Sequence, residues 1–197
     1  MSYVELHCHS NFSFQEGASS IQELLNRAVN LGYEALAITD HNNLCVAMEF
    51  AREARALDIQ PITGAEITLE GGHHATILVK SLEGYSNLCQ IISNAKLNTD
   101  SKRPYVHSRL LSERSEGLIF LTGCNSGEVA KLIRQGKFRE SEEVAKRYIG
   151  EHDLVLDALY EELDATGRKT KADRRKRRQL KSQIRELRKA RVSGGLG

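Results

Sequence analysis

The chain has 197 residues, of which 40% are hydrophobic and 27% charged, as expected for a globular domain with an extension or for two small domains. It has no run of 18 apolar residues, which excludes a transmembrane helix, and its N-terminus lacks the pattern of a signal peptide. The four cysteines, Cys8, Cys45, Cys89 and Cys124, form no CxxC pair. We therefore expect a reducing, cytoplasmic location and no membrane contact.

The formal net charge of +2 combines two regions of opposite charge. Residues 168–191 hold 13 Lys or Arg and 2 Asp or Glu, a local charge of +11. The whole chain has 28 basic and 26 acidic residues. The part outside 168–191 therefore holds 15 basic and 24 acidic residues, a net charge of −9. An acidic body joined to a basic tail makes contact with an acidic partner plausible for the tail alone.

The first elements are predicted from local patterns. Residues 3–9 mix apolar and polar side chains in the manner of a short strand. Ser20 and Glu23 have capping-box spacing, because each side chain can bond a free backbone N–H at a helix start. Apolar residues at helical spacing follow, and Gly32 ends this helix.

Short apolar runs then alternate with helical repeats. The runs predict strands at 34–39, 61–69, 75–80 and 117–122. The repeats predict helices at 44–57, at about 85–95 and at 126–134. This alternation favours an α/β fold with a mainly parallel sheet, either open or closed as a barrel. Beyond Phe138, helical stretches at 139–148, 153–165 and 169–192 follow without a strand. We therefore expect a domain at 1–150 and a helical, basic extension at 151–197.

Candidate metal ligands recur near the ends of the predicted strands. His7 and His9 are two apart on a strand, so both point to one face while Cys8 points to the other. The alternative for this pair alone is two solvated or hydrogen-bonded histidines, since histidine is common on surfaces. The other candidates at strand boundaries are Asp40, His41, Glu66, His73, His74 and Cys124. Ordinary strand ends carry turn residues instead, so this repetition indicates a metal site.

Five blocks in order carry a family resemblance: ELHCHSNFSFQEGAS, LAITDHNNL, GAEI, HHATILVKSLEGYSNL and EGLIFLTGC. They resemble the PHP domain of bacterial DNA polymerase III α subunits, most closely the error-prone class, over residues 3–149. The resemblance implies a distorted (β/α)7 barrel with up to three divalent metal ions. Carried onto matching positions, the implied ligands are His7, His9, Glu16, His41, Glu66, His74 and Cys124. Asp40 is expected to orient a ligand imidazole by accepting its other N–H.

Imidazole and carboxylate ligands suit Zn²⁺, Mn²⁺ or Fe²⁺ better than Mg²⁺. Such ions lower the pKa of a bound water to about 7 and stabilise the oxygens of a transferring phosphoryl group. The expected reaction is hydrolysis of nucleic-acid or nucleotide phosphate esters, and the resemblance links it to 3′–5′ exonuclease activity or pyrophosphate removal. A chain of 197 residues is too short to be a polymerase of this family itself.

The sequence departs from the family at its last block, because the late Asp-x-His is missing and only His152-Asp153 lies downstream. We therefore expect an incomplete barrel, from a truncated, frame-shifted or split gene or in a module completed by another chain. The alternative function is a non-catalytic PHP remnant that stabilises or docks onto a separate DNA polymerase chain.

The basic tail allows three interpretations. Arg174, Arg175, Lys176, Arg177 and Arg178 can contact nucleic-acid phosphates, which makes a nucleic-acid binder with a vestigial barrel a third hypothesis. The segment can also be a solvated, charged helix, or out-of-frame sequence without a selected role. No aromatic residues interrupt it, so base stacking on the tail is not indicated.

Overall fold

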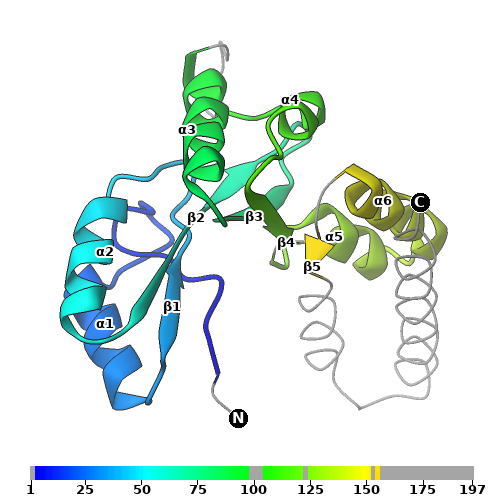
Figure 1. Ribbon diagram of the computed structural model, residues 1–197. Helices are drawn as coiled ribbons and strands as arrows, with labels where there is room; N and C mark the ends of the chain where they lie inside the picture. Colours follow the sequence, from blue (N-terminus) through cyan, green and yellow to red (C-terminus); the bar gives the residue numbers. More distant parts are fainter. Residues whose placement is uncertain (1–2, 98–103, 122–123, 152–153, 156–197) are drawn as a thin grey trace, which may run out of the picture. The chain divides into compact units, whose positions relative to one another are not determined.

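A computed structural model describes residues 3–97, 104–121, 124–151 and 154–155 of the chain (Figure 1). It contains two compact units, Met1–Phe120 and Leu121–Gly197. In chain order, the elements up to the boundary are α1 (Ile21–Asn30), β1 (Ala35–Ile38), α2 (Ala47–Ala56), β2 (Gln60–Thr68), β3 (His74–Val79), α3 (Leu82–Leu97), α4 (Ser108–Glu113) and β4 (Leu118–Leu121).

The sheet of the first unit has the strand order β1-β2-β3-β4 and is mixed. β1 pairs with β2 in parallel, whereas β2 pairs with β3 antiparallel. The predicted α/β class is confirmed, and the prediction of a mainly parallel sheet is confirmed only in part, because β2 and β3 are antiparallel. The cause is the turn between β2 and β3, where Gly71 and Gly72 take φ values of 85° and 76° that favour glycine and reverse the chain directly. The described strands form an open sheet.

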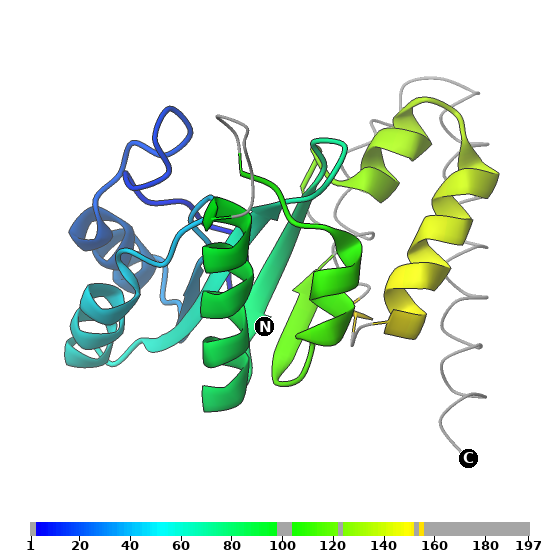
Figure 2. The same ribbon diagram turned by 90° about the horizontal axis from the view of Figure 1, so that it is seen from above.

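Helix α1 confirms the predicted capping box. The Ser20 side chain accepts from the backbone N–H of Glu23, whose carboxylate accepts from the backbone N–H of Ser20. Buried apolar side chains of α1, β1 and α2 form one core, whose members include Leu25, Leu36 and Phe50. These elements lie together in Figures 1 and 2.

Two predicted elements differ in extent from the structure, and one short helix was not predicted. The expected strand at 3–9 is reduced to a single parallel bridge between Glu5 and Leu36, although backbone hydrogen bonds from Ala37 and Thr39 keep this segment beside β1. Helix α2 begins at Ala47 rather than at residue 44. Helix α4 was not predicted, because six residues are too few for a clear helical repeat.

The second unit contains α5 (Glu128–Arg134), α6 (Phe138–Glu151) and β5 (Leu154–Val155). The predicted helices at 126–134 and 139–148 are confirmed, and α5 contacts α6. The predicted helix at 153–165 is wrong at its start, where β5 forms instead. The predicted helix at 169–192 lies outside the described residues, as does the basic run from Arg174 to Arg178. Within the described part of the chain, no helix combines the length and apolar character needed to cross a membrane.

Candidate metal centre

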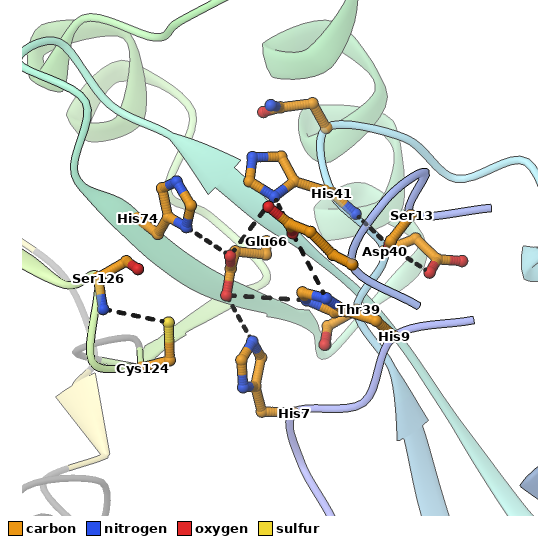
Figure 3. Close-up of polar contacts among 12 residues, drawn as sticks. His7, His9, Ser13, Thr39, Asp40, His41, Glu66, His74, Cys124 and Ser126 are labelled. Atoms are coloured by element: carbon orange, nitrogen blue, oxygen red, sulfur yellow. Dashed lines mark hydrogen bonds and ion pairs between the residues drawn. The ribbon is translucent and has the colours of Figure 1, made fainter. Parts of the chain in front are cut away.

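The buried carboxylate of Glu66 lies among four histidines of the first unit (Figure 3). Beyond the end of β1, a parallel bridge joins His41 to Glu66 on β2. The backbone N–H of Glu66 donates to the carbonyl of Asp40 at 3.1 Å, and that of Asn42 donates to the carbonyl of Glu66 at 2.8 Å. These bonds fix Glu66 beside the C-terminal end of β1, where the sequence places two other candidate ligands.

His7 and His9 approach one oxygen of this carboxylate. Nε2 of His7 lies 2.5 Å from Oε2 of Glu66, and Nε2 of His9 lies 3.8 Å from the same oxygen. Between them, Cys8 packs against the core of α1, β1 and α2. The prediction that the two histidines share a face is therefore confirmed, because alternate residues of an extended chain point to the same side.

His41 and His74 approach the other oxygen. Nδ1 of His74 lies 2.6 Å from Oε1 of Glu66, and Nδ1 of His41 lies 3.6 Å from it. His74 is directly paired with Thr68 across β2 and β3, and Glu66 precedes Thr68 by two residues, so the three share one face of the hairpin. Thr68 also bonds the imidazole of His41, with 2.8 Å between Oγ1 and Nε2.

Two groups of these side chains have the spacing of metal ligands: His7, His9 and Glu66, and His41, Glu66 and His74. With bonds of about 2.0–2.2 Å, two ligands of one zinc ion lie at most about 4.0–4.4 Å apart. The 3.8 Å and 3.6 Å separations from His9 and His41 to Glu66 meet this limit. Nε2 of His9 is also buried without a hydrogen-bond partner among the described residues, which is costly for a polar atom. The donor set therefore fits divalent cations.

Protonation also suits metal binding. Burial would raise the pKa of Glu66, but hydrogen bonds and positive charge from His7 and His74 hold it well below its usual range. Burial lowers the pKa of His9, against the opposing charge of Glu66. The ionised carboxylate of Glu66 and the neutral imidazole of His9 are forms that coordinate metal, whereas His7 and His74 must give up a proton before they can do so.

The buried carboxylate of Asp40 accepts hydrogen bonds from two serines of the loop after His9. The carboxylate, 1% exposed, accepts from the backbone N–H of Ser10 at 2.7 Å, from the Ser10 hydroxyl at 2.6 Å and from the Ser13 hydroxyl at 2.7 Å. The Ser13 hydroxyl oxygen in turn accepts from the backbone N–H of His41 at 3.0 Å. Asp40 thus organises the loop that follows His9. That it also orients a ligand imidazole stays a prediction.

The remaining predicted ligands differ in position. The half-exposed carboxylate of Glu16 is 3.0 Å from Nδ1 of His41 and 3.8 Å from Nδ1 of His9, at the edge of the histidine cluster. Cys124 belongs to the second unit, where its sulfur accepts from the backbone N–H of Ser126. Its participation in a metal site stays a prediction.

Sequence reasoning missed the polar residues that support these ligands. Thr68 could have been found from its position two residues after Glu66 on one strand, which places both on one face. Ser10 and Ser13 carry no such signal, because serine is common in loops for its turn chemistry alone. Their role becomes visible only when Asp40 is placed beside them.

The family model of the PHP domain matches residues 5–157. The chain belongs to the PHP domain family. The family predicted from the five sequence blocks is confirmed.

Known proteins with similar sequences include bacterial DNA polymerases. The chain is 42% identical over 164 residues to an error-prone DNA polymerase of Symbiobacterium thermophilum, covering 75% of this chain and 15% of that one. It is 48% identical over 139 residues to the error-prone DNA polymerase of Pseudomonas aeruginosa, covering 68% and 13%. Against DNA polymerase III subunit alpha of Treponema pallidum, identity is 38% over 162 residues, covering 75% and 14%. This PHP chain thus spans about a seventh of the length of these relatives.

Solved structures give weaker likenesses. An amidohydrolase from Chromobacterium violaceum is 26% identical with a TM-score of 0.39, covering 47% of this chain and 33% of that one. A two-domain protein from Bacteroides vulgatus, containing a predicted PHP-like metal-dependent phosphoesterase, is 15% identical with a TM-score of 0.43, covering 77% and 51%. Membership of the PHP family is established by the sequence matches.

Proposed function

We propose that this PHP chain is a metal-dependent phosphoesterase module that hydrolyses nucleic-acid or nucleotide phosphate esters. The observation that carries the proposal is the shared carboxylate of Glu66, whose two oxygens each face a different pair of imidazoles. A pair of neighbouring cation sites with a common ligand suits a reaction in which negative charge develops on several phosphoryl oxygens. The polymerase relatives support a substrate with nucleotide phosphates.

The side chains of the two groups would hold Zn²⁺, Mn²⁺ or Fe²⁺, which accept mixed nitrogen and oxygen ligands. When bound, such ions make hydroxide available near neutral pH and stabilise charge on the phosphoryl oxygens. Glu16 and Cys124 are proposed as additional ligands. Net hydrolysis joins a water oxygen to phosphorus and breaks the ester bond, and the released alcohol keeps one proton of the water.

The protein's own contribution is to fix the ligands before the substrate binds. His74 and Glu66 are held by the β2–β3 hairpin, and His41 is held by Thr68 and by its backbone bond to Ser13. Ligands held in place in this way lose little further freedom when cations and substrate bind. We therefore expect activity to depend on these supports as well as on the imidazoles.

The test is hydrolysis of a phosphodiester and a phosphomonoester across a series of divalent metals, with Mn²⁺ included. We expect weak turnover that Mn²⁺ increases and that His9→Ala abolishes. His107→Ala is the matched control, because this exposed histidine bonds Glu70 outside both ligand groups and should keep activity. Hydrolysis no greater than that of His9→Ala with every metal would overturn the proposal.

A second candidate is the non-catalytic module that stabilises or docks onto a separate DNA polymerase chain. This candidate predicts metal binding without hydrolysis. The incomplete (β/α)7-type barrel, the 1–150 domain with its basic extension, the 3′–5′ direction of hydrolysis and the cytoplasmic location belong to the same set of proposals.

A further inference from the structure

A pocket of about 880 Å³ opens beside the histidine cluster in the first unit. Glu16, His41 and His74 form the side of the pocket that belongs to the cluster. The lining also includes three aromatic residues, Phe12, Phe14 and Tyr105, and the basic residue Lys96. The volume falls within the range of about 300–1,000 Å³ that is usual for small-molecule sites.

The phenylalanines of this pocket are unusually accessible for apolar side chains. Phe14 is 83% exposed and Phe12 is 40% exposed. Isolated exposed apolar residues are common, but here they line one pocket together with Tyr105. The exposed rings therefore provide apolar aromatic surface next to the proposed reaction centre.

The loop that carries these rings is held firmly. The Asp40 carboxylate bonds Ser10 and Ser13 on either side of Phe12, and the Asn43 side chain donates to the carbonyl of Phe12 at 3.2 Å. At the end of the loop, a Cβ on Gly17 would lie 2.0 Å from the carbonyl oxygen of Ser10, so this close return of the chain requires glycine. An exposed ring on a fixed loop loses little freedom when a ligand stacks on it.

We propose that this pocket binds a nucleobase of the substrate, by stacking on Phe14 with Phe12 and Tyr105 at its sides, while Lys96 attracts a phosphate that is not cleaved. The inference rests on the proposed function and specifies its substrate class as phosphate esters that carry a base. Aromatic side chains accept any base, because every base has a π-face. The shared chemistry is that of a nucleotide, either free or at the end of a single strand.

The test is equilibrium binding of a short fluorescent thymidine oligonucleotide to the full chain in EDTA, so that turnover plays no part. A second oligonucleotide carries an abasic residue at its 3′ end. We expect the abasic oligonucleotide to bind wild type about fivefold or more weakly, from the usual energy of one base stacked on an aromatic ring. Phe14→Ala should weaken binding of the normal oligonucleotide equally and remove the difference between the two. The basic tail attracts both oligonucleotides equally, since their phosphates are the same.

Phe14→Trp should keep the preference for a base, because it keeps a stacking surface. Leu82→Ala is the matched control, since Leu82 is 86% exposed and does not line the pocket. Equal binding of the two oligonucleotides by wild type, or an unchanged preference in Phe14→Ala, would overturn the proposal. Competition separates the free nucleotide from the end of a single strand as the ligand. Thymidine monophosphate and the unlabelled oligonucleotide each compete with the fluorescent oligonucleotide, and the one that displaces it at the lower concentration identifies the ligand.

Hydrolysis with Mn²⁺ is measured separately on the same two oligonucleotides. Base-dependent binding without hydrolysis would support the nucleobase pocket and contradict the phosphoesterase function. Base-independent binding with equal hydrolysis of both would support the function and overturn the pocket.

Discussion

Glu66 belongs to both groups of candidate ligands, which makes it the most sensitive residue of the site. Glu66→Gln keeps the shape of the side chain but removes the negative charge that faces four imidazoles. Loss of a residue that only supports a metal ligand usually lowers metal affinity by roughly 10–100-fold. We expect a larger fall for Glu66→Gln, because Glu66 is itself a ligand shared by both groups. Isothermal titration with Mn²⁺ or Zn²⁺ measures the change.

The control for this substitution is Glu70→Gln. Glu70 is an exposed carboxylate bonded to His107 at 2.9 Å, and it belongs to neither ligand group. Its replacement should leave metal affinity unchanged. Equal losses in the two variants would show that the effect comes from general charge and not from coordination.

At the scale of the element, the loop between His9 and α1 depends on the buried Asp40 carboxylate. Asp40→Asn replaces one acceptor oxygen with a donor that faces other donors, those of Ser10 and Ser13. We expect the free energy of unfolding to fall by about 1.5–3 kcal/mol, the usual contribution of a hydrogen bond to a charged group. Urea denaturation measures this change in the free energy of unfolding. Asp58→Asn is the control that should leave stability unchanged, because Asp58 is exposed and its φ of 56° suits asparagine. A loss no larger than that of the control would contradict this role.

For the whole molecule, bound metal should stabilise the fold and do so in a pH-dependent way. At 100 times the dissociation constant, metal should add about 2.7 kcal/mol to the free energy of unfolding at pH 8. This increment should shrink as the pH falls below about 6.5, because protons then compete with metal for the imidazoles. Burial lowers the pKa of His9, so the part of the metal stabilisation that depends on this imidazole is lost at a lower pH. Urea denaturation at pH 8 and pH 5.5, with metal and with EDTA, measures the increment; equal increments would be inconsistent with imidazole ligands.

The basic tail gives a second prediction for the whole molecule. Deleting residues 168–197 removes the 13 basic residues of the 168–191 segment and should weaken DNA binding at low salt, because fewer counterions are released on binding. Metal content should stay the same, since both ligand groups lie between residues 7 and 74. Binding isotherms at two salt concentrations, together with elemental analysis, measure both quantities. Tight DNA binding by the truncated chain at the same salt would show that the tail has no part in it.

The sequence by itself determined the α/β class, the capped start of α1 and the residue types of the candidate site. These features follow from local patterns: the spacing of Ser20 and Glu23 sets the helix start, and alternation places His7 and His9 on one face. Only the tertiary structure decided that β3 reverses to pair with β2, and that Glu66 lies between two pairs of imidazoles. It also decided that Asp40 supports a loop. The reason is physical: these contacts join residues up to 59 positions apart, such as His7 and Glu66, and depend on strand register and chain reversal, which local periodicity does not specify.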